Sequence, residues 1–264
     1  MIAAVLQARM SSTRLPGKVL RPILGRPMLW HQLERIRQAR RLDEVVLATS
    51  TDPSDDPLAA LAQQLGVRCF RGALADVLDR FYCAAASVDA EHVVRLTADC
   101  PLTDPMLLDQ VVAAHCAAGS DYCSNVHPRT YPDGLDVEVM RTSALRQAWQ
   151  EAQLPSEREH VTPFLYHHPE RFCLHSVRQE RDLSRLRWVV DHAVDLEVVT
   201  EVYRRLWRES QPAFGMAEVL ALVASEPDLF LRNADHDPDE GWRKSLAADA
   251  EFLRTKEPHV PPLP

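Results

Sequence analysis

The chain of 264 residues lacks the cysteine and histidine spacings that usually mark a structural metal site or a disulfide framework. None of its six cysteines forms a Cys-x-x-Cys pair, and its eleven histidines include no His-Glu-x-x-His pattern. No signal-peptide pattern precedes the cysteines, so we interpret them as small buried thiols. No apolar stretch approaches the ~20 residues that a membrane span needs. We therefore expect a soluble, cytoplasmic protein without a membrane partner.

The chain also lacks the positive net charge of a general nucleic-acid binder. Its formal charge is −8, yet residues 1–41 hold nine Lys or Arg and one acid, which leaves the remainder at −16. A basic corner on an acidic protein suits a small phosphorylated ligand better than a long polyanion, so we expect no nucleic-acid partner. Four of the basic residues are assigned to a solvated helix face: Arg35, Arg37, Arg40 and Arg41.

Strand and helix patterns alternate through the first half of the chain. The apolar run of residues 2–6 is typical of a buried strand. Gly66 suits a helix end, and Asp104 followed by Pro105 is a good helix start. The expected strands are 2–6, 44–49, 67–70, 92–97 and 121–125, and the expected helices are 28–40, 57–66, 76–87 and 105–118. This repetition predicts an α/β fold with a mostly parallel sheet covered by helices on both faces.

The second half changes character, and the sheet is expected to become mixed there. The patterns predict strands at 135–140, 172–177 and 186–190 and helices at 143–152 and 193–209. We expect one domain over residues 1–224 and a helical C-terminal extension over 225–264. The extension ends in a Pro-rich tail, residues 258–264, which we expect to be frayed.

The opening strand runs into a loop that holds Arg9, Arg14, Gly17 and Lys18, without a Walker sequence. Ligands of open α/β sheets bind beyond the carboxyl ends of the strands. An Arg side chain can bind phosphate through two parallel hydrogen bonds, and a Lys side chain acts as a point charge. Gly17, which has no Cβ, would let the backbone approach the phosphates. The loop therefore indicates a nucleoside triphosphate site, although an ordinary surface loop with three cations has the same pattern.

Two carboxylates follow other predicted strands. Asp99 comes directly after strand 92–97, and Asp191 comes after the segment 186–190. Mg²⁺ usually takes one or two protein carboxylates together with substrate phosphates, so these two aspartates are candidate metal ligands if they converge. The alternative for Asp99 is a cap on the turn before Pro101. Asp195 is better explained as the cap of the helix behind it.

Three further clusters could contact the nucleotide or a polar acceptor. Each also has a plain structural explanation, such as a helix cap, a charged hairpin or a solvated helix start. Residues 136 and 138 are expected on the same side of one strand. The candidates are Arg71 and Asp76 beside the base, and Tyr131, Asp133, Asp136, Glu138, Glu157, Arg158 and His160 beside the acceptor.

The segment 7–18 (QARMSSTRLPGK) closely resembles the opening motif of the cytidylyltransferase family that includes the spore-coat polysaccharide biosynthesis F-type proteins. It is also similar to the opening of 3-deoxy-manno-octulosonate cytidylyltransferases. The likeness continues over most of the chain. It includes segments 71–72, 76–80, 96–102, 131–138, 156–163 and 186–191, and more weakly 239–246.

The resemblance implies a nucleotidyltransferase fold similar to the GT-A glycosyltransferase fold, CTP as donor, Mg²⁺ as cofactor and a possible homodimer. By similarity, Arg9, Arg14 and Lys18 would hold the triphosphate, while Asp99 and Asp191 would hold the metal. We expect a cytidylyl transfer from CTP to a small anionic acceptor, with Lys18, Arg14 and Asp99 as the catalytic residues. The function would lie in surface polysaccharide biosynthesis.

Two alternatives stay open at this point. A glycosyltransferase on the same fold would use a nucleotide sugar, and the nearest variant of its Asp-x-Asp pair is Asp136 with Glu138. The other alternative is a non-catalytic nucleotide-binding module. The joint presence of Lys18, Asp99 and Asp191 speaks against a decayed site.

Overall fold

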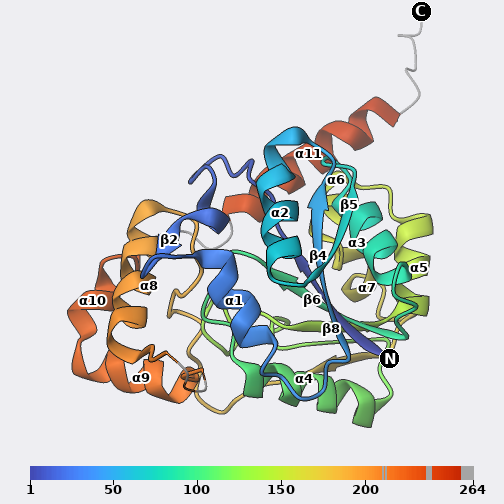
Figure 1. Ribbon diagram of the computed structural model, residues 1–264. Helices are drawn as coiled ribbons and strands as arrows, with labels where there is room; N and C mark the ends of the chain where they lie inside the picture. Colours follow the sequence, from blue (N-terminus) through green and yellow to red (C-terminus); the bar gives the residue numbers. More distant parts are fainter. Residues whose placement is uncertain (210, 212, 236–239, 257–264) are drawn as a thin grey trace, which may run out of the picture.

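A seven-stranded sheet organises the protein, in the order β5-β4-β1-β6-β8-β7-β9 (Figure 1). The computed structural model describes residues 1–209, 211, 213–235 and 240–256. Neighbouring strands from β5 to β6 run parallel, whereas β8 is antiparallel to both β6 and β7. The sheet is therefore mixed and mostly parallel, as predicted. Its strands are β1 (Ile2–Gln7), β4 (Glu44–Ser50), β5 (Arg68–Gly72), β6 (His92–Thr97), β7 (Tyr122–Ser124), β8 (Glu138–Arg141) and β9 (Leu174–Ser176).

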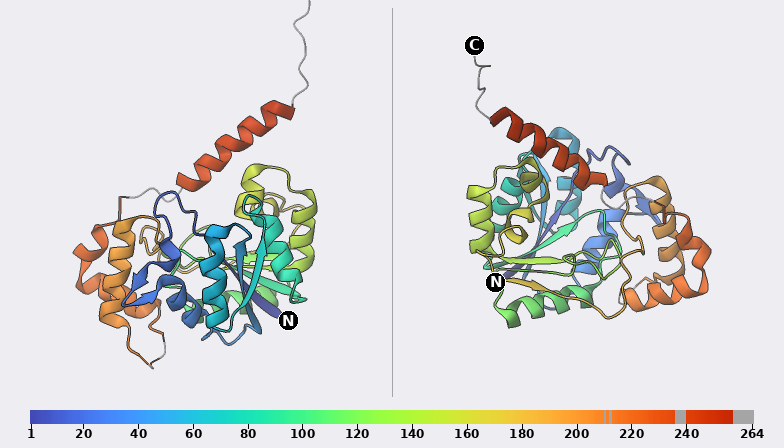
Figure 2. Two further views of the ribbon diagram at one scale, coloured as in Figure 1. Left: turned by 45° about the horizontal axis from the view of Figure 1, so that its top comes forward. Right: turned by 180° about the vertical axis from the view of Figure 1, so that it is seen from behind.

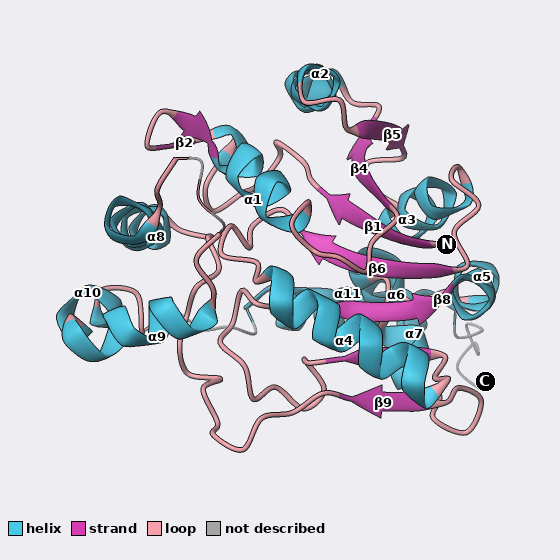
Figure 3. Cartoon of the chain, turned by 60° about the horizontal axis from the view of Figure 1, so that its bottom comes forward, coloured by secondary structure: helices cyan, strands magenta, loops and turns pink. Residues whose placement is uncertain are grey.

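Helices cover both faces of the sheet because its apolar strands bury side chains alternately on either side (Figure 3). In β1, Ala4 and Leu6 belong to one buried cluster, whereas Ala3 and Val5 belong to the other. The first cluster packs against α1 (Met28–Ile36), α2 (Asp56–Gln64), α4 (Pro105–Ala118) and α8 (Ala193–Leu206). The second packs against α3 (Val77–Ala86), α5 (Thr142–Glu151) and α7 (Pro163–Tyr166).

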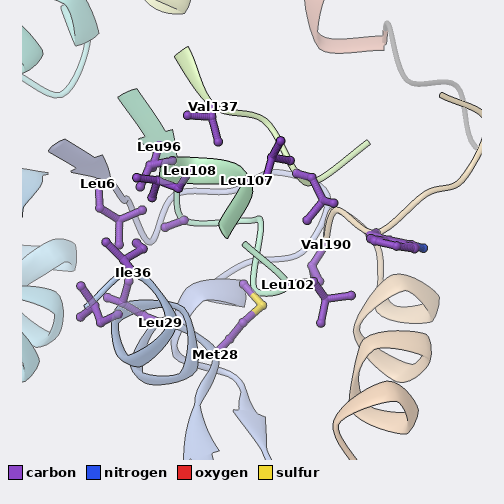
Figure 4. Packing of buried hydrophobic residues seen from close by; sticks show 14 of the residues in the cluster. Leu6, Met28, Leu29, Ile36, Leu96, Leu102, Leu107, Leu108, Val137 and Val190 are labelled. Atoms are coloured by element: carbon purple, nitrogen blue, oxygen red, sulfur yellow. The ribbon is translucent and has the colours of Figure 1, made fainter. Parts of the chain in front are cut away.

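The first apolar cluster extends to the carboxyl edge of the sheet (Figure 4). Leu6, Leu96 and Leu102 join Val190 in this cluster, and each is at most 2% exposed. The backbone N–H of Val190 donates to the carbonyl of Asp99 at 2.8 Å. Core packing therefore brings the segment before Asp191 beside the end of β6.

The predicted strand at 186–190 is wrong. Arg187 makes only an isolated bridge to Asp133, because a second loop lies against this segment. Gly134 has φ +104°, and a Cβ there would lie 2.5 Å from the backbone nitrogen of Val189. The segment is therefore packed between the 133–135 loop and Asp99, and it joins no strand of the sheet.

Two other expectations fail in detail. Arg35 is buried and not solvated: its Nε donates to the Thr103 carbonyl at 2.7 Å, and its guanidinium lies 4.3 Å from the Phe214 ring centre. The long side chain faces inward because α1 packs under the loop before the C-terminal helices. Cys116 and Cys173 are exposed, because the first lies on the outer side of α4 and the second precedes the edge strand β9.

The C-terminal residues form α9 (Met216–Ser225), α10 (Pro227–Leu231) and α11 (Glu240–Lys256). Figure 2 shows α11, in red, as a long helix at one end of the molecule. It packs on α6 (Pro155–His160). The predicted Pro-rich tail lies outside the described residues, and the domain boundary after residue 224 stays a prediction. None of the described helices has the length and apolarity to cross a bilayer.

Candidate active site

The cationic loop and the end of β6 emerge side by side because β1 and β6 are parallel neighbours, with Gln7 paired to Thr97. Buried Asp55 anchors the loop from the start of α2: its Oδ1 accepts from the Met10 backbone nitrogen at 2.7 Å. Gly17, at φ +67°, then turns the chain into a short 3₁₀ helix that begins at Lys18. The turn aims the Lys18 side chain back toward the edge of the sheet.

Lys18 joins the two predicted metal ligands. Its Nζ lies 3.0 Å from Asp99 Oδ2, 2.8 Å from Asp191 Oδ1 and 2.8 Å from the Val190 carbonyl. The whole residue is only 8% exposed. The two aspartates therefore converge, as the sequence analysis required, on one ammonium group at the carboxyl edge of the sheet.

The ion pairs set the protonation of this cluster. Burial lowers the pKa of Lys18, but the nearby carboxylates of Asp99 and Asp191 outweigh it and raise that pKa above its ordinary value. Burial raises the pKa of Asp99, and the Lys18 ammonium outweighs it and holds the pKa well below its usual range. Lys18 is therefore charged and Asp99 ionised at neutral pH.

A second layer of charges holds Asp191 in place. Arg14 Nη2 donates to Asp191 Oδ1 at 2.7 Å, and Arg187 Nη2 donates to Oδ2 at 3.3 Å. Asp195 accepts from the backbone nitrogens of Asp191 and His192 at 2.9 and 2.8 Å. Asp195 thus caps α8, as predicted, and its contacts fix the backbone at Asp191.

A pocket of about 400 Å³ opens over this cluster. Six of its lining residues are Lys or Arg, against three Asp or Glu, so the pocket is cationic in a protein whose net charge is −8. That balance suits a polyanionic ligand. The predicted site residues on its lining are Arg9, Arg14, Lys18, Asp99, His160 and Asp191.

The predicted base-side residues lie outside the pocket lining. Arg71, in β5, donates from Nε to the carbonyl of Ser50 at the end of β4 at 2.8 Å, and it forms an ion pair at 2.7 Å with Asp56 at the start of α2. Asp76 caps α3, accepting from Asp79 N at 2.9 Å, and forms an ion pair with Arg158. These contacts give both residues a structural role, and their contact with a nucleotide stays a prediction.

Glu157 and Gly17 are also absent from the lining. The Glu157 carboxylate caps its own helix, accepting from the backbone nitrogens of Gln153 and Leu154 at 3.1 Å. A Cβ on Gly17 would lie 3.2 Å from the Met10 methyl group. Its positive φ thus gives the glycine a conformational role in the turn.

The acidic segment 131–138 does not present its side chains to the pocket. Tyr131 is buried in the core. Asp133 lies 3.4 Å from Arg129 and 3.5 Å from Arg187, and burial together with the charge of Asp136 raises its pKa to about 7.

Asp136 and Glu138 do not share one strand face, which corrects the expectation for these two residues. The strand β8 begins only at Glu138, because the preceding residues turn around Asn125, which accepts from the Val137 nitrogen at 2.8 Å. Asp136 pairs with Arg129. Glu138 is buried against Arg95, and it accepts from Thr162 Oγ1 at 2.7 Å.

Several pocket residues were not identified as site residues from the sequence. Arg80 projects from α3, Arg95 from β6, Glu159 from α6, and Lys244 and Ser245 from α11. All of these residues except Arg95 lie inside segments that carried the family resemblance. The family resemblance could therefore have identified these residues. No sequence pattern in α11 itself predicts that this helix packs over the sheet edge.

Asp99 and Asp191 could hold a divalent cation such as Mg²⁺ only if a bound substrate supplied further oxygen ligands. In the described part of the chain, no group of three or more His, Cys, Asp or Glu side chains could hold a metal. Asp99 and Asp191 instead offer two carboxylates on a pocket that already holds a cation between them. Mg²⁺ is commonly held by one or two carboxylates and completed by substrate phosphates, which matches this donor set.

Comparison with known proteins agrees with this geometry. The family model described as cytidylyltransferase matches residues 3–203. The spore coat polysaccharide biosynthesis protein SpsF of Bacillus subtilis is 33% identical over 234 residues, covering 86% of this chain and 95% of its own. The structure of a cytidylyltransferase from Leptospira borgpetersenii superimposes with a TM-score of 0.83 at 30% identity, over 88% of this chain and 97% of that one.

A more distant structure shares the fold. It is a CMP:2-keto-3-deoxy-manno-octonic acid synthetase in complex with CTP, with a TM-score of 0.59 at 19% identity. The match covers 77% of this chain and 98% of that one. An α/β sheet with a cationic pocket and paired carboxylates at its carboxyl edge, together with these matches, defines a nucleotidyltransferase. The chain belongs to the cytidylyltransferase family.

Proposed function

We propose that this enzyme couples CTP to a small sugar acid and releases pyrophosphate, with Mg²⁺ as cofactor. The observation that carries the proposal is Lys18, held between Asp99 and Asp191 in a pocket lined by an excess of cations. The family supports CTP as the nucleotide. The synthetase with the same fold acts on a keto sugar acid by its name, which supports that acceptor class.

In the proposed reaction, an acceptor oxygen attacks the α-phosphorus of CTP. A bond forms between that oxygen and the α-phosphorus, the bond from the α-phosphorus to its bridging oxygen breaks, and pyrophosphate leaves with the electron pair. Arg9, Arg14 and Lys18 offset the charge that grows on the pyrophosphate. Alignment of the two substrates in one pocket supplies much of the remaining rate enhancement.

Asp99 and Asp191 are the residues that would hold Mg²⁺. When bound, the ion would supply positive charge that stabilises the reacting phosphate groups. Arg187 and the Asp195 carboxylate, which accepts from the Asp191 backbone nitrogen, keep Asp191 pointed at the pocket. The attacking group is a hydroxyl of the acceptor, whose proton passes to solvent as the new bond forms, and no side chain is assigned as its base.

The glycosyltransferase alternative depends on Asp136 and Glu138, and neither residue lines the pocket: Asp136 pairs with Arg129, and Glu138 is buried against Arg95. No observation favours it over nucleotidyl transfer. A role in polysaccharide biosynthesis is part of the proposal and is supported by the name of the Bacillus relative. The homodimer is a prediction from the resemblance.

The test is pyrophosphate release by the purified protein with Mg²⁺ and each of the four ribonucleoside triphosphates, against a panel of sugar acids and matched neutral sugars. The proposal predicts release with CTP and a sugar acid, and none without an acceptor. Release with neutral sugars alone would overturn the acceptor class. Cleavage of a nucleotide sugar to its diphosphate, without pyrophosphate release, would overturn the reaction.

A further inference from the structure

The C-terminal helix α11 forms one wall of the active-site pocket. Gly241, Lys244, Ser245 and Ala248 line it, and their spacing of three, one and three residues places them on one face of the helix. This helix lies beyond the residues 3–203 that the family model matches. Its contribution to the site is therefore argued from the contacts that the helix makes in this structure.

Buried contacts hold α11 in this position. Ser245 Oγ lies 2.9 Å from His160 Nε2 and 3.0 Å from Glu159 Oε2, and the residue is 3% exposed. Asp249, 7% exposed, accepts from the Ser156 backbone nitrogen at 2.8 Å. Buried polar pairs of this kind are costly to leave unmade, so the helix is docked in a specific register on α6.

The backbone at the end of α6 has an unusual conformation beside its contact with α11. Val161 follows His160 at φ +73° and is fully buried. Such a conformation costs a non-glycine residue on the order of 1–3 kcal/mol. The strained turn directs Glu159 and His160 toward α11 and the pocket, where both line the cavity.

Lys244 projects from this wall with an exposed side chain. The cationic loop after β1 supplies Arg9, Arg14 and Lys18 to the same pocket, and Arg9 lies 3.8 Å from Glu159 of α6. Of the residues predicted beside the acceptor, His160 is the one that lines the pocket, and it contacts Ser245, the neighbour of Lys244 in the chain. A cation in this part of the pocket is where the acidic group of a sugar acid would find a counter-charge.

We propose that Lys244 binds the acidic group of the acceptor and makes the enzyme specific for acids over neutral sugars, with Ser245 and Asp249 as positioning residues that hold the helix. This inference rests on the proposed function. A charge-assisted hydrogen bond from Lys244 to a carboxylate strengthens acceptor binding and leaves CTP binding untouched.

The test compares steady-state kinetics of the full-length wild type with Lys244→Ala, Lys244→Arg and a matched control, Arg254→Ala. Arg254 lies on the same helix, 71% exposed and paired with Glu251, away from the pocket lining. Lys244→Ala is expected to raise the acceptor KM about tenfold or more, with the KM for CTP within about twofold. Lys244→Arg should recover most of the loss, and Arg254→Ala should behave as wild type.

The outcomes separate the two proposals. If the wild type releases pyrophosphate and Lys244→Ala leaves the acceptor KM unchanged, the role of Lys244 is overturned while the proposed function stands. If Lys244→Ala raises both KM values equally, the residue binds the nucleotide instead and the acceptor assignment fails. If the wild type transfers nothing from CTP to any sugar acid, the proposed function falls and the acceptor role of Lys244 falls with it.

Discussion

Lys18 Nζ lies 2.8 Å from Asp191 Oδ1, although the two residues are 173 positions apart in the chain. The contact closes the loop after β1 onto the segment that precedes α8. Because this lysine also contacts Asp99, one side chain holds together three separate segments at the sheet edge. Its dual role in charge balance and in the proposed chemistry makes it the first target for substitution.

Replacing Lys18 with Ala should lower kcat about 100-fold or more, since a preorganised cation at the reacting phosphates is lost. The thermal stability of the variant should be affected much less than its turnover, because Asp191 keeps its contacts with Arg14 and Arg187. Pyrophosphate release and thermal unfolding measure the two effects. A variant that unfolds at assay temperature, or one that keeps full turnover, would contradict the catalytic role.

Added Mg²⁺ should raise the Tm of Lys18→Ala more than that of the wild type. In the wild type the ammonium already compensates Asp99 and Asp191, whereas the variant leaves the two carboxylates with more uncompensated charge for a divalent cation. Thermal scans with Mg²⁺ and with EDTA make the comparison, and Arg254→Ala serves as the control. Equal shifts in all three proteins would argue against a metal site on these aspartates.

Replacing Glu138 with Gln should destabilise the protein by about 3–5 kcal/mol, because it leaves the Arg95 guanidinium, whose side chain is 14% exposed, without its counter-ion. Glu151→Gln, which breaks an exposed pair with Arg171, is the control and should change stability little. Urea unfolding measures both. A Glu138→Gln protein of normal stability with a raised acceptor KM would restore the substrate-binding role predicted from the sequence.

His115 should contribute to acid sensitivity. Burial, and then the neighbouring His92, lowers its pKa to about 4, while an unfolded histidine titrates near pH 6.5. Between these values the unfolded chain binds the extra proton, so stability falls as the pH drops from about 6.5 toward about 4. Unfolding of His115→Gln across this range should show a pH slope shallower by about one proton, and an unchanged slope would contradict the prediction.

Much of the fold follows from local sequence signals. Alternating apolar runs and strong caps place most elements, and Asp104 caps α4 where predicted, accepting from Met106 N at 2.8 Å. The segment 186–190 is apolar like a strand, but what it pairs with depends on the distant Gly134 loop. Tertiary packing decides whether such a segment joins the sheet, and the local sequence pattern does not indicate that packing.

The candidate site, like the fold, is only partly predictable from the sequence. Arg9, Arg14, Lys18 and Asp99 follow the ends of β1 and β6, and the convergence of strand ends at one edge is a general property of α/β sheets. Asp191 follows a segment that packs at the same edge without being a strand, so its place there depends on tertiary packing. Charged residues away from strand ends could not be sorted from the sequence. Glu138 and Asp76 have the same residue types as site carboxylates, and only the structure pairs them with Arg95 and Arg158. The α11 wall depends on how a distant helix docks on α6.

The identity of the products tests the central claim most directly. Wild-type protein, CTP, Mg²⁺ and the sugar acid panel should be incubated together and the products resolved by ³¹P NMR and mass spectrometry. The account predicts a phosphodiester that joins CMP to the sugar acid, with one pyrophosphate for each bond formed, and formation slower by about 100-fold or more with Lys18→Ala. Formation of CDP, or of pyrophosphate without a CMP-linked sugar, would contradict attack of an acceptor oxygen on the α-phosphorus.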